Sequence, residues 1–294
     1  MQVPSHVEYE RATSVEHALA LLGRPDHWVL AGGHSLIPMM KLRLAQPGVL
    51  VDINGLAELA YIKVTGGQLR IGAMARHADL LDSNLAGQHF PIFHDAERVV
   101  ADPIVRLWGT IGGSLCQADP SEDLSAVFAA VHAIAVIRGR DGNREVAVRE
   151  FHRGPYETII GPGELLAEIR VPVHPGTGSA YEKVARRVGD WSVAAAGAVL
   201  QLDQGIVRQA GIGLTAVGAE HFVAAEAEDY LRGKAATEPN FEQAAKIAAE
   251  HCHPVADQRG PEDYKRHLVA ELTTRALRRA ASRAVGRAAQ RAKT

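Results

Sequence analysis

The stretch LAGGHSLIPMM, residues 30–40, places two adjacent glycines between an apolar run and the start of a predicted helix. A second stretch, GTIGGSLCQADP at residues 109–120, contains the same device. Glycine loses more backbone freedom on folding than any other residue, so a pair is costly unless the fold needs bare backbone there. The pairs Gly32–Gly33 and Gly112–Gly113 therefore raise the question of what requires it.

Anion binding is one answer. Successive backbone N–H groups with no Cβ in the way form a concavity that binds anions, and a helix that begins there adds its positive end. One loop can hold one phosphate, and two loops from separate subdomains can hold both halves of a diphosphate. The nearby residues Ser35, Thr110 and Ser114 add hydroxyl donors. The alternative is that each pair only makes a tight turn. A matched pair in the same context favours binding.

Composition excludes several other classes of protein. The chain has 294 residues, of which 47% are apolar, and this is typical of a globular protein with a sizeable core. A net charge of −2 gives no reason to expect nucleic acid as a partner. No apolar run is long enough to cross a membrane, and the first residues lack a signal pattern, so we expect a cytoplasmic protein. Cys116 and Cys252 cannot bind an iron–sulfur cluster, which takes four thiolates.

Three further motifs carry less weight. The chain has no GxxxxGK[ST] sequence, which excludes a P-loop nucleotidase. GIGLTAVGA at 211–219 matches a dinucleotide fingerprint by letters alone, but it lies in a predicted strand meander without a βαβ unit. HCHP at 251–254 lacks a third or fourth ligand, so we expect no metal on this chain.

Local patterns predict the first elements. Thr13 and Glu16 have capping-box spacing, which predicts a helix that ends at Gly23. A buried strand follows over residues 27–33, and Ser35 is expected to cap a second helix that extends to about Leu44. Asp102 and Pro103 predict another helix start. After a Pro/Gly-rich boundary at 171–180, the chain is expected to form three meandering strands and then helices.

Several segments, in this order along the chain, together resemble a known family. They are AGGHSLIPMMKLRLAQP, IGAM, ADPIVRLWGTIGGS, ADPSEDLSA, PGELLAEIRVP, YEKVARRVGDWSVAAA and DQRGPEDYKRHL. With them the chain resembles the FAD-binding medium subunits of the molybdenum hydroxylases, the xanthine dehydrogenase family, and within them the branch of the aerobic carbon monoxide dehydrogenases. This implies an α+β chain with a PCMH-type FAD-binding fold of two small α/β subdomains, and a C-terminal three-stranded antiparallel sheet with helices. The expected boundaries are 1–57, 58–176 and 177–294.

The resemblance also implies which residues contact FAD. Asp123 would hydrogen-bond the sugar-alcohol or ribose part, and Leu166 would line the adenine side. Lys183 would bring a positive charge, and Trp191 would cover the flavin ring. The two glycine loops would hold the diphosphate through amides and hydroxyls, with the residues Ala31, Gly32, Gly33, His34, Ser35, Leu36, Thr110, Ile111, Gly112, Gly113 and Ser114.

Some features leave alternatives open. Trp191 stands where close relatives often have Tyr. VRLWGTIGG replaces the VRNRGTIGG of many relatives that hydroxylate other substrates, and this second difference favours the carbon monoxide branch. The His34 ring is either a base or, as we favour, packed locally while its amide binds. The basic tail is either a solvated helix or a docking element for a partner subunit or an anionic surface. Its residues are Arg275, Arg278, Arg279, Arg283, Arg287, Arg291 and Lys293.

The function implied is that of an electron-relay subunit with no catalytic residue of its own. [2Fe–2S] clusters on a small partner would deliver electrons to FAD, and a quinone-type acceptor would take them. The molybdenum-pterin cofactor on a large partner would oxidise CO to CO2, in a dimer of heterotrimers that could attach to the inner face of the membrane. The alternatives are a large subunit for a purine, a heterocycle or an aldehyde, a free-standing flavoenzyme, and a non-catalytic assembly protein. Intact glycine loops count against the last.

Overall fold

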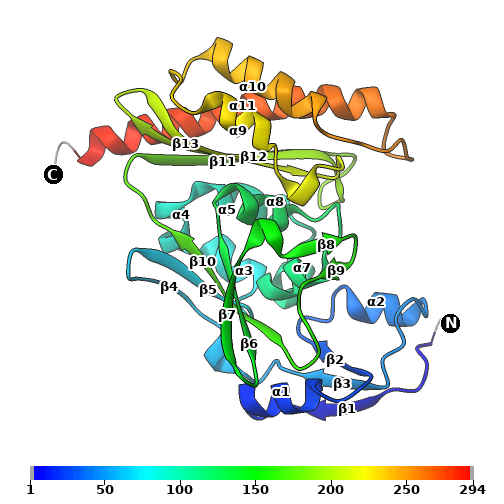
Figure 1. Cartoon of the computed structure of the whole chain (residues 1–294). Helices are drawn as coiled ribbons and strands as arrows, with labels where there is room; N and C mark the ends of the chain where they lie inside the picture. Colours follow the sequence, from blue (N-terminus) through cyan, green and yellow to red (C-terminus); the bar gives the residue numbers. More distant parts are fainter. Residues whose placement is uncertain (1–2, 292–294) are drawn as a thin grey trace.

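Three β-sheets follow one another along the molecule, from the N-terminal part at the bottom of Figure 1 to the C-terminal part at the top. The computed structural model describes residues 3–291, with side chains through residue 286. Within this range, no helix is both long enough and apolar enough to span a bilayer. The expected α+β architecture, with a three-stranded antiparallel sheet in its C-terminal part, is confirmed.

The first sheet is parallel and has the spatial order β1-β3-β2. Its elements are β1 (Glu8–Arg11), α1 (Val15–Leu22), β2 (His27–Leu30), α2 (Leu36–Lys41) and β3 (Val49–Asp52). Each helix connects two strands, so the first glycine loop leaves the carboxyl end of β2 and lies beside the carboxyl end of β3. This edge of a parallel α/β sheet is where ligands generally bind.

Two helix starts differ from the sequence prediction. The N-cap of α1 is Ser14, whose hydroxyl accepts a hydrogen bond from the His17 N–H at 3.1 Å, and not Thr13. Helix α2 ends at Lys41, and Ser35 makes no capping hydrogen bond because its backbone is already helical. A helical N-cap residue does not aim its side chain at the amides of the first turn. The Ser35 hydroxyl therefore stays available.

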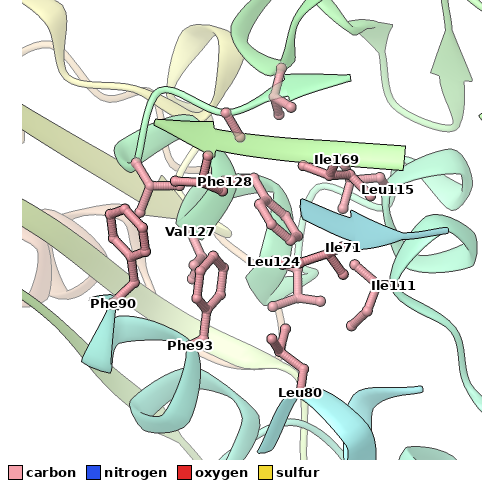
Figure 2. Close-up of a cluster of buried hydrophobic side chains, with 14 of the residues drawn as sticks. Ile71, Leu80, Phe90, Phe93, Ile111, Leu115, Leu124, Val127, Phe128 and Ile169 are labelled. Carbon is pink, nitrogen blue, oxygen red and sulfur yellow. The ribbon is translucent and has the colours of Figure 1, made fainter. Parts of the chain in front are cut away.

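The middle sheet is antiparallel and covers the main hydrophobic core. In spatial order its strands are β4 (Ile62–Thr65), β5 (Gln68–Gly72), β10 (Leu165–Pro172), β6 (Ile134–Gly139) and β7 (Gly142–Ala147). The helices between β5 and β6 are α3 (His77–Asp82), α4 (Asn84–His89), α5 (Pro91–Glu97), α6 (Pro103–Trp108), α7 (Ile111–Gln117) and α8 (Asp123–Ala130), and β8 (His152–Gly154) and β9 (Glu157–Thr158) form a small hairpin. Phe93 and Phe128 meet at the centre, with ring centroids 5.2 Å apart (Figure 2).

The C-terminal sheet lies between two helical layers. Its strands β11 (Thr177–Ala185), β12 (Ser192–Asp203) and β13 (Ile206–Thr215) form the predicted antiparallel meander. One face is covered by α9 (Ala225–Leu231), α10 (Glu238–Glu250) and the long α11 (Glu262–Arg291). The other face rests on α5 and α8 of the middle part (Figure 1).

Packing explains the glycines of the GIG motif at 211–213. A Cβ on Gly211 would overlap the backbone carbonyl of Ala130, and one on Gly213 would overlap that of Ala126. Both carbonyls belong to α8, so the helix lies in direct contact with the backbone of β13. These glycines therefore serve helix–sheet packing, and the motif is not a dinucleotide-binding loop, as expected from its place in a strand meander.

The basic tail docks on its own chain. Arg279 and Arg283 of α11 both donate to the carboxylate of Asp95 on α5, with Nη2–Oδ1 distances of 3.0 Å. Arg278 pairs with Glu238 on α10. Arg279 and Arg283 are therefore engaged within the chain, while Arg278 stays 57% exposed, in keeping with a solvated helix face. Lys293 and the side chains of Arg287 and Arg291 lie outside the part of the chain that is described.

Candidate functional site

The first glycine loop presents a row of unpaired amides. Among the described residues, none accepts a hydrogen bond from the backbone N–H groups of residues 31–36. The loop is half-buried apart from Ser35, which is exposed. Gly33 has φ +72°, a left-handed conformation that glycine adopts without strain. Unpaired consecutive amides that include a left-handed residue are typical of a backbone anion site.

The second glycine pair is built differently. It follows helix α6 and not a strand, and both glycines lie inside the first turn of α7, whose N-cap is Thr110. The Ile111 and Gly112 amides donate to the carbonyls of Ala75 and Ala73 at 2.9 and 2.8 Å. The Gly113 amide donates to the Thr110 hydroxyl at 3.1 Å.

These bonds correct one expectation. The Ser114 amide donates to the Thr110 carbonyl, so the predicted row of free amides is absent from residues 111–114. Ser114 Oγ is also engaged, because it donates to Glu122 Oε2 at 3.0 Å. Thr110 is the exception in this segment, since no described residue accepts from its backbone N–H. The symmetric two-loop site is therefore wrong as a description of the amides, and the first loop is the main donor.

The two glycine segments touch each other. A Cβ on Gly32 would overlap the carbonyl oxygen of Trp108 and would lie 2.8 Å from the Cα of Gly109. A Cβ on Gly112 would lie 2.6 Å from the Cβ of Ala73. Both positions therefore need glycine for close backbone approach as well. The carboxyl edge of the first sheet and the start of α7 form one continuous surface.

Asp123 and Lys183 form a buried ion pair beside this surface. Lys183 Nζ donates to Asp123 Oδ2 at 2.8 Å, and the two side chains are 3% and 6% exposed. The Tyr181 hydroxyl and Ser192 Oγ donate to Oδ1 at 2.6 and 2.9 Å. A carboxylate accepts about four hydrogen bonds. Asp123 therefore keeps one acceptor position for a further donor, and three bonds hold it in place.

A second buried pair lies behind Gly109. His77 Nδ1 and Glu97 Oε2 are 3.0 Å apart, and both side chains are buried. Burial alone would lower the pKa of His77, but the Glu97 carboxylate outweighs it, so the pKa is raised. The backbone N–H of His77 donates to the Gly109 carbonyl at 3.3 Å. The pair thus supports the segment that leads into α7.

The remaining predicted site residues are placed differently. Trp191 is 45% exposed and immediately precedes β12, so its ring can cover a ligand. The ring of His34 turns back to the Gly32 carbonyl, 3.0 Å from Nδ1, as expected for local packing. Leu166 is 2% exposed in the core of the middle sheet, so its side chain does not reach the surface of the site.

Comparison with known proteins identifies the family. Residues 5–174 match the FAD binding domain in molybdopterin dehydrogenase, and residues 179–280 match the CO dehydrogenase flavoprotein C-terminal domain. The chain belongs to the FAD-binding family of the molybdopterin dehydrogenases. This is a FAD-binding chain, as the resemblance implied. The FAD contacts of the glycine loops, the Asp123–Lys183 pair and Trp191 stay a prediction.

Three relatives within this family illustrate its range. The chain is 40% identical to the carbon monoxide dehydrogenase medium chain of Afipia carboxidovorans, over 96% of this chain and 99% of the relative. It is 35% identical to the glyceraldehyde dehydrogenase medium chain of Sulfolobus acidocaldarius, over 95% and 99%. It superposes with a TM-score of 0.92 on the carbon monoxide dehydrogenase from Hydrogenophaga pseudoflava, solved without the Mo-pyranopterin moiety of its molybdenum cofactor, at 42% identity over 96% and 99%.

Sequence reasoning missed two residues of this FAD-binding chain's site. Asn54 donates to the Ala31 carbonyl of the first glycine segment, and Arg76 donates to the Trp108 carbonyl beside the second. Asn54 carries a usable signal, because a polar residue just after a parallel strand lies at the ligand-binding edge. Arg76 lies in AMARHADLL, where no motif distinguishes it from an ordinary surface arginine.

Proposed function

We propose that the chain is the FAD-carrying electron-transfer subunit of a molybdenum, [2Fe–2S] and flavin complex of the carbon monoxide dehydrogenase type. The observation that carries this proposal is the loop of residues 31–36, whose amides have no acceptor among the described residues. Such a row of donors suits diphosphate oxygens. The donor set therefore fits FAD, the nucleotide named by the matching family.

Each site residue then has a distinct role. The amides of residues 31–36, with the Ser35 hydroxyl and the Thr110 N–H, bind the diphosphate, while residues 111–114 form the opposite wall. The free acceptor position of Asp123 takes a hydroxyl of the ribityl or ribose part, and Lys183 holds the carboxylate in place through its bond to Oδ2. Trp191 covers the flavin ring. Leu166 is assigned no contact with FAD, since the whole residue is only 2% exposed. When bound, FAD supplies the redox group, and this chain supplies orientation and electrostatics.

The partners are proposed on the same basis. A small subunit would bring [2Fe–2S] clusters, a large subunit would bring the molybdenum-pterin cofactor and oxidise CO, and a quinone-type acceptor would take the electrons, in a cytoplasmic dimer of heterotrimers. The relatives are named as medium chains, which supports partner subunits. Helix α6 also supports them, since Ile104, Leu107 and Trp108 are all more than half exposed on it. This apolar face adjoins Gly32 through Trp108, so a docked iron–sulfur subunit would lie beside the flavin.

Purification of the native complex tests the proposal. We expect FAD, molybdenum and iron in the preparation, and dye reduction that depends on CO. Titration of the isolated chain with FAD and FMN adds a direct test, since FMN lacks the diphosphate and should bind far more weakly. Equal affinity for both nucleotides, or no flavin binding at all, would contradict the assigned role of the first loop.

A second candidate changes only the substrate of the large subunit. The specific observation behind it is that a glyceraldehyde dehydrogenase medium chain is 35% identical to this one, close to the 40% of a carbon monoxide relative. A complex that contains molybdenum and FAD but does not oxidise CO would favour this candidate. Screening the same preparation with aldehydes, purines and N-heterocycles would then identify the substrate class.

A further inference from the structure

The side-chain amide of Asn54 is fully committed to neighbours at the edge of the first sheet. Nδ2 donates to the Ala31 carbonyl and to Asp52 Oδ1, both at 2.7 Å, and Oδ1 accepts from Arg76 Nη2 at 2.8 Å. The Asn54 backbone N–H also donates to Asp52 Oδ1, at 2.8 Å. Both N–H donors of the Asn54 side chain and its oxygen are engaged, and these three bonds fix the orientation of the amide group. Asn54 therefore links the first glycine loop firmly to Arg76.

Arg76 reaches the second glycine segment with its other terminal nitrogen. Nη1 donates to the Trp108 carbonyl. The same oxygen is the atom that a Cβ on Gly32 would overlap. The chain of contacts from Ala31 through Asn54 and Arg76 to Trp108 therefore closes a ring around the place where the two segments meet.

Arg76 also keeps its positive charge. Within residues 3–291, no carboxylate oxygen lies within 4.0 Å of its guanidinium, and both of its hydrogen-bond acceptors are neutral oxygens. The residue is only half-buried between the loops. Asp79 and Asp52 attract this guanidinium only from beyond ion-pair distance. A cation without a direct ion pair, beside a row of unpaired amides, favours an anionic ligand.

We propose that Arg76, held by Asn54, is a positioning residue that fixes the spacing between the two glycine segments and adds positive charge for the nucleotide diphosphate. This inference rests on the proposed FAD binding. The planar guanidinium donates to two acceptors in fixed directions, which the single point charge of lysine cannot do. Asn54 transmits the constraint to the Ala31 carbonyl, and hence to the amides that follow it.

The test is the affinity of the full-length, flavin-free chain for FAD, followed by quenching of flavin fluorescence, and for ADP, followed by calorimetry. ADP carries the diphosphate without the flavin. Arg76→Ala should weaken both ligands by about tenfold or more, because charge-assisted hydrogen bonds are lost. Arg76→Lys should restore only part of the FAD affinity. Arg208→Ala is the matched control, since it removes an arginine paired with Asp203 in the distant β12–β13 hairpin and should change neither affinity.

Two Asn54 variants test the link itself. Asn54→Asp keeps the shape and strengthens attraction to Arg76, but it places a carboxylate oxygen against both the Ala31 carbonyl and the Asp52 carboxylate. FAD should therefore still bind more weakly. Asn54→Ala combined with Arg76→Ala should lose no more affinity than the worse single variant, since both act through one chain of contacts.

The outcomes distinguish failure of the Arg76 positioning role from failure of FAD binding by the chain. Wild-type affinity for FAD and ADP in Arg76→Ala would overturn the positioning role alone. A lower melting temperature of flavin-free Arg76→Ala with unchanged affinity at 10 °C would likewise show a purely structural residue. If the wild-type chain binds neither FAD nor ADP, the proposed function fails together with this inference.

Discussion

A Cβ on Gly32 would overlap backbone, the Trp108 carbonyl, whereas a Cβ on Gly33 would meet chiefly the flexible end of Ile37, at 2.9 Å. Backbone held from both sides cannot yield, so we expect Gly32→Ala to lower the free energy of unfolding by about 1–3 kcal/mol. It should also weaken FAD binding, because the loop must move. Urea unfolding and FAD titration measure the two effects. Gly87→Ala is the control, since its Cβ meets no atom within 4 Å. Equal stability of the two variants would contradict the close approach.

His132 should make stability depend on pH. Burial, with a smaller effect of Arg149, lowers the pKa of His132 to about 4, and its Nε2 lies 3.2 Å from the Ala210 carbonyl. An unfolded histidine has a pKa near 6.5, so protons bind the unfolded chain first as the pH falls. Stability from this group is therefore present above about pH 6.5 and is lost as the pH falls toward 4.

The expected loss between pH 7 and pH 5 is about 2 kcal/mol for this group. His132→Asn removes the titration, and asparagine tolerates the positive φ of 52° at this position. Urea unfolding at both pH values should show a smaller pH effect in the variant by that amount. An identical pH effect in both proteins would show that His132 is protonated in the fold without penalty.

At the scale of elements, local chemistry predicted the cap of α6 but not the caps of α1 and α2. Asp102 caps α6 as expected, because its carboxylate needs only the Val105 amide, 2.9 Å away. Thr13 and Ser14 are adjacent hydroxyl residues, and either could cap α1. The Ala12 amide donates to the Asp52 carbonyl, so β1 keeps its contact with β3 up to Ala12, and the helix begins only after Ser14. The sequence pattern predicted a loop at the second glycine pair, whereas both glycines lie in the first turn of α7. Gly112 is needed for its close packing on Ala73, which is a contact between segments distant in the sequence. No pattern along the chain reports such contacts, and the same is true of Arg76.

Helix α6 gives a prediction for assembly. None of its residues is buried, and the apolar side chains of Ile104 and Leu107 are 65% and 61% exposed. Leu107→Asp should leave FAD affinity unchanged and weaken association with the proposed iron–sulfur subunit at least about tenfold, because a charge would be desolvated at the contact. Size-exclusion chromatography of the co-expressed subunits measures this. Val255→Asp, an equally exposed apolar position at 73% in the C-terminal part, should assemble normally. Normal assembly of Leu107→Asp would rule out α6 as the docking face.

At the scale of the whole molecule, the C-terminal sheet connects the FAD-binding part to the helical layer above it. Tyr181 on β11 and Ser192 on β12 donate to Asp123 of α8, so the C-terminal sheet supplies part of the candidate site. The Lys183–Asp123 pair crosses the same junction. The site therefore requires both parts to be docked in one arrangement.

Asp95 of α5 makes a further connection across this junction. Its carboxylate accepts from Arg279 and Arg283 of α11 and from the Tyr181 amide, and it is only 10% exposed. Asp95→Ala leaves two half-exposed arginines without this partner, so we expect a loss of about 1–3 kcal/mol, less than for a fully buried pair. Because the lost contacts lie between the two parts, calorimetry should show the C-terminal part melting before the rest, with FAD released at the first transition. Asp203→Ala breaks an exposed pair with Arg208 inside one hairpin and should keep a single transition. Loss of stability in Asp95→Ala with one transition throughout would mean that the remaining contacts, among them Lys183–Asp123 and Arg149–Glu228, suffice to couple the parts.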